Sequence, residues 1–218
     1  MLTRILVLAA AVSFPAFAAD PHARIEPHRF KGPEGREVAA EIGRFEVPVN
    51  RGGGASETME LAFVRFPSTN PNPGAPIVYL AGGPGGSGTG TAAGPRFPLF
   101  MKLRQVADVI AFDQRGTGLS HTPPPCPDQK PLPLERAGTR EAWIEHIGAE
   151  IRRCTAFWRA EGVDLAAYNT RESADDLEDL RKALGADRIA LWGISYGTHL
   201  ALAMLKRHPD SVERVVLA

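Results

Sequence analysis

The chain has 218 residues, of which 44% are hydrophobic, and its 25 basic residues balance its 25 acidic residues. This size is enough for one domain with a substantial hydrophobic core. The formal net charge of zero gives no support for a nucleic acid or an anionic membrane as partner, because both bind basic surfaces.

The first residues have the pattern of a secretory signal peptide. A basic residue precedes the apolar run Ile5–Val12, and Ala16–Ala18 places small residues where signal peptidases cut. The apolar run is too short to span a bilayer, and no cysteine lies near the cut to carry a lipid anchor. We predict a signal peptide over residues 1–19, cut after Ala18 or Ala19, and a secreted or periplasmic protein. A buried N-terminal helix is the alternative, which the proline before the cut disfavours.

The chain contains two cysteines, Cys126 and Cys154. In an oxidising compartment such a pair can form a disulfide. This bond would close a loop of roughly 30 residues and stabilise the fold by about 3–4 kcal/mol in the chain-entropy model. Two separate buried thiols are the alternative. A metal site is not expected, because neither cysteine has a second cysteine or a histidine at ligand spacing.

Hydrophobic patterns that alternate between strand and helix predict the architecture. Residues 20–42 are expected to form an extended N-terminal arm. Its first part, residues 20–33, is polar and contains prolines. Strands are expected over residues 36–50, 58–67, 76–81, 108–113, 188–195 and 212–218, and helices over residues 97–106, 139–162, 173–185 and 198–209. Ser173 is expected to cap its helix, and Gly185 to end it. This alternation indicates a mostly parallel, doubly wound α/β sheet, with the first two strands as an antiparallel hairpin at its edge.

The stretch Gly193–Gly197 reads GISYG and lies between a predicted strand and a predicted helix. This is the context in which G-x-S-x-G forms a sharp turn that lifts the serine to the carboxyl edge of a sheet. The glycines remove side chains that would collide across the turn, and the next helix directs its N-terminus at the site. We predict that Ser195 is a nucleophile and that Gly193 and Gly197 shape the turn. A plain turn with a capping serine is the alternative.

Residues 82–90 read GGPGGSGTG and follow another predicted buried strand. A Walker phosphate loop is excluded, because it requires a lysine that is absent here. Gly83, Gly85 and Gly88 have the spacing of a dinucleotide-binding loop, and Asp113 ends the next strand, where a ribose-binding acid would lie. Glycines and prolines break the helix that such a loop requires, and an exported protein has little access to the dinucleotide.

An oxyanion hole is the interpretation that fits this glycine loop best. G-x-S-x-G enzymes take one N–H from the residue after the nucleophile, here Tyr196, and another from a loop after an earlier strand. Gly83 is the predicted donor, with Gly82 next, because glycine lets the backbone approach a carbonyl oxygen closely. The loss of one such donor typically costs about 3–4 kcal/mol of transition-state stabilisation.

Three motifs stand in chain order: GGPGGSG from residue 82, DQRGTGLS from residue 113 and GISYGT from residue 193. Together they resemble the proline-iminopeptidase-like serine peptidases of the α/β-hydrolase superfamily, closest to the secreted tripeptidyl-aminopeptidase branch. The stretch TRESADDLEDLRKALG before the nucleophile strand resembles that branch as well. Proline iminopeptidases usually carry a histidine before the glycine pair, whereas Ala81 stands there in this chain.

The resemblance implies an α/β-hydrolase fold over residues 43–218. It matches Ser195 to the nucleophile, and Gly83 and Tyr196 to the oxyanion donors. It matches residues 113–115 to a loop that is mainly structural, whose carboxylate and guanidinium satisfy neighbouring backbone groups. The two cysteines match a disulfide that is often seen in the secreted branch.

In this superfamily the acid and the histidine of the triad follow the serine along the chain. The residues after Ser195 contain His199, His208, Asp210 and Glu213. His199 is one turn along the nucleophile helix and the others lie at its far end, so none is expected to serve Ser195. His121 is expected to be a solvated loop residue, and Asp175 and Asp176 to be helix-start charges. We therefore expect the acid, the histidine, the C-terminal strands and a cap domain to follow residue 218, and this chain to be inactive alone.

The leading hypothesis is an exported aminopeptidase that acylates Ser195 with the N-terminal part of a peptide and then hydrolyses the ester. An esterase that acts on small or lipid esters is an alternative, since the same core serves both. A non-catalytic binding protein on a vestigial hydrolase core is another. No cofactor, nucleic acid or membrane anchor is expected.

Overall fold

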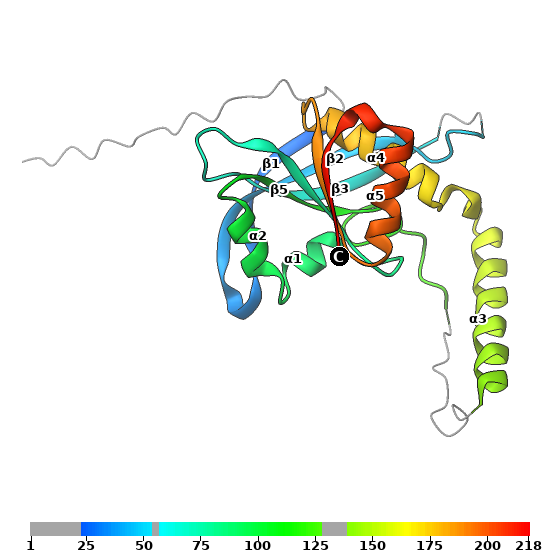
Figure 1. The fold of residues 1–218 in the computed structure, drawn as a ribbon. Helices are drawn as coiled ribbons and strands as arrows, with labels where there is room; N and C mark the ends of the chain where they lie inside the picture. Colours follow the sequence, from blue (N-terminus) through cyan, green and yellow to red (C-terminus); the bar gives the residue numbers. More distant parts are fainter. Residues whose placement is uncertain (1–22, 54–56, 128–138) are drawn as a thin grey trace, which may run out of the picture.

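The structure is a computed structural model that describes residues 23–53, 57–127 and 139–218 (Figure 1). The predicted signal peptide lies outside the described residues. In chain order the elements are β1 (Ala23–Lys31), η1 (Pro33–Gly35), β2 (Glu37–Pro48), β3 (Thr58–Phe66), β4 (Gly74–Leu80), α1 (Gly88–Ala92), α2 (Phe97–Leu103), β5 (Ala107–Asp113), α3 (Arg140–Ala160), η3 (Leu165–Ala167), α4 (Thr170–Ala183), β6 (Ile189–Gly193), α5 (Tyr196–Arg207), η4 (Pro209–Ser211) and β7 (Val212–Leu217).

The described strands form one mixed sheet in the order β1-β2-β3-β5-β4-β6-β7. Strands β5, β4, β6 and β7 pair in parallel, whereas β1, β2 and β3 form an antiparallel meander that joins β5. The chain leaves β4 toward β5 on one side and later returns to β6 on its other side. Ligands of open α/β sheets bind at the carboxyl ends of strands where the order reverses in this way. The loops after β4 and β6 both lie at that point.

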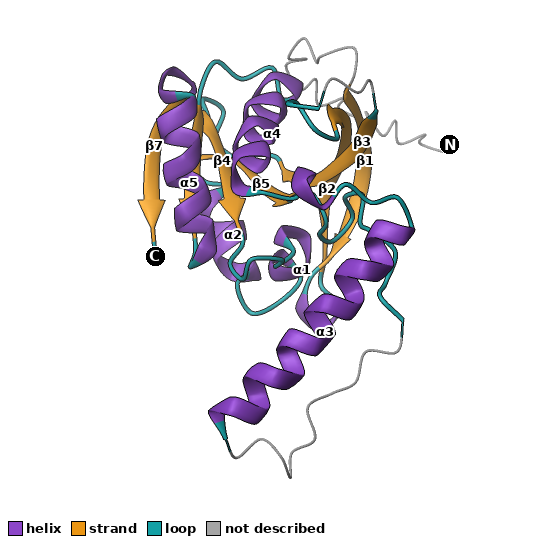
Figure 2. Cartoon of the chain, turned by 90° about the vertical axis from the view of Figure 1, so that its right-hand side faces the viewer, coloured by secondary structure: helices purple, strands orange, loops and turns teal. Residues whose placement is uncertain are grey.

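Two buried clusters of apolar side chains fill the space on the two faces of the sheet. Alternate residues of β5 enter different clusters: Ile110 and Phe112 pack with α4 and α5, and Val109 and Ala111 pack with α2. This alternation follows from the two-residue period of a strand, and it requires a strand that is apolar on both faces. Figure 2 shows α4 and α5 in front of the sheet, while α3 extends away from it.

Two local features differ from the sequence-based expectation. Residues 23–31, within the segment predicted as an arm, are extended but pair along their whole length with β2. The buried ring of Phe30 anchors this strand, because it lies 4.9 Å from the ring of Phe66. The prediction that Ser173 caps its helix is wrong. Helix α4 begins at Thr170, and the Asn169 side chain accepts hydrogen bonds from the N–H groups of Arg171 and Glu172.

No helix in the described part of the chain is long and apolar enough to cross a bilayer.

Candidate active site

Ser195 lies in the turn between β6 and α5, at the carboxyl edge of the sheet. Its φ of 52° and ψ of −118° place it in a region that side-chain-bearing residues rarely adopt. Glu34 is the other non-glycine residue with a positive φ among the described residues. Such backbone strain persists only where the surrounding structure enforces it, and it concentrates at functional sites. The Ser195 residue is exposed to solvent, so its hydroxyl is open to a substrate.

The two glycines of the turn are required by its close packing. A Cβ atom on Gly197 would lie 2.1 Å from the carbonyl oxygen of Leu80, at the end of β4. A Cβ atom on Gly193 would lie 2.5 Å from the carbonyl oxygen of Gly197, across the turn. Real Cβ atoms are essentially never so close to backbone, so any side chain here would push the serine out of place. Both positions are therefore fixed by contacts within the turn and with the neighbouring strand.

The glycine loop after β4 runs directly beside Ser195. A Cβ atom on Gly82 would lie 3.0 Å from Cβ of Ser195 and 3.5 Å from its Oγ. Gly83 has a φ of 116°, and a Cβ atom there would lie 2.9 Å from the backbone nitrogen of Gly85. The loop is closed by a hydrogen bond of 3.0 Å from the Gly86 N–H to the Gly82 carbonyl. The structure thus brings the two stretches that the sequence singled out into contact.

Tyr196 is the first residue of α5. The first N–H groups of a helix have no carbonyl four residues earlier to bind, and the helix dipole adds positive potential at this end. An anion beside Ser195 would therefore meet an N–H donor from the helix on one side and the glycine backbone on the other. This arrangement suits a tetrahedral oxyanion.

Asp113 is buried and structural. Its carboxylate accepts hydrogen bonds from Ser87 Oγ at 2.8 Å, Thr89 Oγ1 at 2.6 Å and the N–H groups of Thr89 and Leu119 at 3.1 and 2.8 Å. It therefore ties the start of α1 to the loop after β5. The same bonds leave no free carboxylate oxygen for a ribose, which argues against a dinucleotide site.

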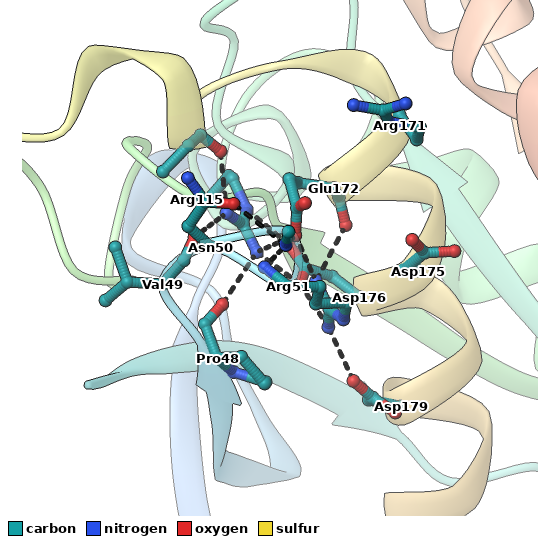
Figure 3. Close-up of polar contacts among 12 residues, drawn as sticks. Pro48, Val49, Asn50, Arg51, Arg115, Arg171, Glu172, Asp175, Asp176 and Asp179 are labelled. Atoms are coloured by element: carbon teal, nitrogen blue, oxygen red, sulfur yellow. Dashed lines mark hydrogen bonds and ion pairs between the residues drawn. The ribbon is translucent and has the colours of Figure 1, made fainter. Parts of the chain in front are cut away.

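Arg115 and Arg51 form a buried ion cluster with acids of α4, drawn in Figure 3. The Arg115 guanidinium donates to both oxygens of Asp176 at 2.7 Å, and its remaining donors bind the backbone carbonyls of residues 48, 49 and 167. The Arg51 guanidinium donates to the carboxylates of Glu172, Asp176 and Asp179 at 2.8, 2.9 and 2.6 Å. The loop after β5 is thereby fixed to α4. Sequence reasoning treated Asp176 as a helix-start charge and missed this role.

No described histidine or carboxylate is hydrogen-bonded to the Ser195 hydroxyl. His199 is exposed on α5 and lies beside the Tyr196 ring. His208, at the other end of the same helix, bonds Asp175 at 2.8 Å. Burial raises the pKa of Asp175, but hydrogen bonds from Arg207 and His208 outweigh it and hold this pKa below its ordinary value. His121 is exposed in its loop. The described residues therefore place no base at the Ser195 hydroxyl.

A pocket of about 590 Å³ opens beside the nucleophile turn and the glycine loop. Its described walls come from Pro84 and Gly85, from Tyr196, from residues 114–117 and 122–126 of the loop after β5, and from Trp158 and residues of the stretch 165–173. We call residues 122–126 and Trp158 the outer wall of the pocket. The predicted disulfide fastens this wall: Cys126 and Cys154 are bonded, with their Cα atoms 5.5 Å apart. Sequence reasoning did not find this pocket, because its walls come from segments far apart in the chain.

The strained serine, the glycine loop and the reversal of strand order define a class of hydrolytic enzyme. Residues 75–218 match the family described as alpha/beta hydrolase fold, and the chain belongs to this family. The expectation of an α/β-hydrolase fold is thus confirmed, as is membership of an enzyme family.

Peptidases stand among the relatives. The chain is 30% identical over 181 residues to serine protease Hip1 of Mycobacterium tuberculosis (strain ATCC 25618 / H37Rv), a match that covers 80% of this chain and 35% of that one. It is 30% identical over 158 residues to the tripeptidyl aminopeptidase of Streptomyces lividans, covering 65% and 27% of the two chains. A solved structure of a proline iminopeptidase-related protein from Thermus thermophilus is 24% identical, covers 80% of this chain and 43% of that one, and has a TM-score of 0.46.

The family match and the two curated relatives confirm the resemblance to serine peptidases that the three motifs indicated. The chain spans about a third of the length of the curated relatives that it matches. The roles of Ser195, Gly83, Tyr196, Gly193 and Gly197 stay predictions, for which the geometry above is the support.

Proposed function

We propose that this chain carries the nucleophile and the oxyanion hole of an exported serine peptidase that removes short peptides or residues from peptide N-termini. The observation that carries the proposal is the contact between the strained Ser195 and the glycine loop. The peptidase names of the relatives support the reaction class. The predicted signal peptide and the disulfide support export, since disulfides persist in oxidising compartments.

In the proposed reaction, Ser195 Oγ attacks the scissile carbonyl carbon. The carbonyl oxygen becomes an oxyanion, which accepts hydrogen bonds from the N–H groups of Gly83 and Tyr196. The C–N bond then breaks, the amine leaves with the proton of the serine, and an acyl-enzyme remains. Water hydrolyses this ester and frees Ser195. The proton transfers require a base that the described residues do not present to the serine, so the proposal needs a histidine from outside them.

The test is hydrolysis by the native protein, purified from its producer. Tripeptidyl and single aminoacyl p-nitroanilides are compared with p-nitrophenyl esters, for the wild type and for Ser195→Ala. We expect p-nitroanilide hydrolysis to fall by about 10⁴-fold or more in Ser195→Ala, in line with other serine hydrolases that lose their nucleophile. Ser211→Ala serves as the matched control and should keep full activity. Ser211 ends η4 at the amino end of β7, whereas Ser195 lies at the carboxyl ends of the strands.

Two results would overturn the proposal. Unchanged peptide hydrolysis in Ser195→Ala would remove the nucleophile assignment. Hydrolysis of the esters without any release from the p-nitroanilides would make the protein an esterase.

A further inference from the structure

The pocket lies beside the turn that holds Ser195, and Pro84, Gly85 and Tyr196 are among the residues that line it. These residues adjoin or include the proposed oxyanion donors, Gly83 and Tyr196. A carbonyl held between those donors therefore has the pocket next to its own residue. The volume of about 590 Å³ lies within the range of pockets that bury small ligands.

The described lining of this pocket offers no free charge. Its aromatic and aliphatic members are Pro84, Trp158, Leu165, Tyr168 and Tyr196, together with the prolines 123–125. Arg115 is the charged member, but its side chain is 1% exposed and is neutralised by Asp176, with every donor bonded. No carboxylate is present among these lining residues. An ammonium, guanidinium or carboxylate group in the pocket would lose its water without gaining an opposite charge.

The polar atoms of two of the three aromatic walls are also engaged. Trp158 donates from Nε1 to the Pro124 carbonyl oxygen at 2.8 Å. The hydroxyl groups of Tyr196 and Thr170 bond one another at 2.8 Å. Burial raises the pKa of Tyr168 above its ordinary value, so its hydroxyl stays neutral. The rings of Trp158 and Tyr196 are therefore held in place by bonds to the protein, which leaves mainly apolar surface for a ligand.

We infer that this pocket is the subsite for the side chain of the residue that contributes the scissile carbonyl, and that it accepts uncharged apolar or aromatic side chains and rejects charged ones. This inference rests on the proposed function. It adds a substrate class, namely peptides whose cleaved bond follows a residue such as leucine or phenylalanine rather than lysine or glutamate.

The test uses covalent probes on the native protein, with rates of labelling as the readout. Aminoalkyl diphenylphosphonates that carry phenylalanine, leucine, lysine or glutamate side chains react when Ser195 Oγ displaces one phenoxide, which leaves as phenol with the serine proton. A fluorophosphonate without a side chain is the reference. We expect the phenylalanine and leucine probes to label at least about tenfold faster than the lysine and glutamate probes.

Two variants on α3 separate the pocket from the rest of the helix. Trp158→Ala removes a pocket wall and should slow the phenylalanine probe by about tenfold, with the fluorophosphonate rate changed by less than about twofold. Trp143→Ala removes a tryptophan that is 52% exposed on the same helix and should leave both rates unchanged. Leu165→Glu covers the case in which Trp158→Ala does not fold. It should raise the labelling rate of the lysine probe relative to that of the phenylalanine probe.

The outcomes distinguish the two proposals. Fluorophosphonate labelling with equal rates for all four side chains, or with faster lysine or glutamate probes, would overturn the subsite and leave the serine hydrolase intact. Failure of the fluorophosphonate itself would overturn the proposed function instead. Equal losses in Trp158→Ala and Trp143→Ala would also contradict the subsite.

Discussion

The turn formed by residues 193–197 and the outer wall of the pocket are held in place by different means. The turn is fixed by backbone contacts that leave no room for a side chain at Gly193 or Gly197. The wall is fixed by side chains: the disulfide of Cys126 and Cys154, and the bond from Trp158 to its loop. We infer that the first region sets the chemistry of the site and that the second sets its choice of substrate.

The Arg115–Asp176 pair, which lies outside both regions, fixes the loop after β5 to α4, and its removal should have the largest effect on stability. Asp176→Ala removes the carboxylate that accepts two hydrogen bonds from the buried Arg115 guanidinium and leaves only the carboxylate of Glu172, at 3.8 Å, which typically costs about 3–5 kcal/mol. Asp179→Ala is the matched control, because its carboxylate is 30% exposed and pairs with Arg51 and Lys182 rather than with Arg115, and it should cost less than about 1 kcal/mol. Urea denaturation measures both values. Equal losses would contradict a structural role for Asp176.

Loss of the disulfide should affect the wall more than the turn. We expect the double change of Cys126→Ser and Cys154→Ser to lower the free energy of unfolding by about 3–4 kcal/mol, since the bond spans 28 residues. Limited proteolysis should then cut between residues 121 and 160 first, while fluorophosphonate still labels Ser195. If labelling is lost before any cut in this segment, the two regions are not separable.

A methyl group in the turn should affect the turn more than the outer wall. Gly197→Ala places Cβ against the backbone of Leu80, and overpacking of this kind typically costs about 1–3 kcal/mol, with displacement of Ser195 and loss of labelling. Gly74→Ala is the matched control, because its Cβ would meet the nearest atom at an ordinary 3.6 Å. A labelled, active Gly197→Ala protein would show that the turn tolerates a side chain.

The smallest effect is expected at the far end of α5, where Asp175 binds Arg207 and His208. The pKa of Asp175 is lowered in the folded state, so its contribution is present above the unfolded pKa and is lost as the pH falls through the folded one. Asp175→Asn should therefore cost less than about 1 kcal/mol at pH 7, and this cost should shrink as the pH falls through the folded pKa. Urea denaturation at several pH values measures this cost. A difference in unfolding free energy between the wild type and Asp175→Asn that grows toward acid pH would contradict this expectation.

The sequence predicts the turn better than the wall for a physical reason. The turn is encoded by residues within two short stretches, so the spacing of glycine and serine is enough to infer its geometry. The pocket depends on Trp158 of α3, Tyr168 of the loop before α4 and Tyr196 of α5, which line one space only after these segments have packed. Burial of Asp176 was missed for the same reason, because its partners Arg51 and Arg115 are 125 and 61 residues away.

Two predictions from local sequence patterns failed where contacts with other parts of the chain determine the local structure. Residues 23–31 carry a proline and several charges that favour an arm, yet the Phe30 ring packs against Phe66 and makes the segment an edge strand. Ser173 has the chemistry of a cap, but Asn169 lies one turn earlier and bonds the N–H groups of Arg171 and Glu172.

The most direct test of the central claim is to locate the covalent adduct of a fluorophosphonate on the native protein by peptide mass mapping. The account predicts one adduct, on the peptide that contains Ser195, with no adduct in Ser195→Ala and full labelling in Ser211→Ala. An adduct on another serine, or no adduct on a native protein that hydrolyses peptides, would contradict the assignment of Ser195 as the nucleophile.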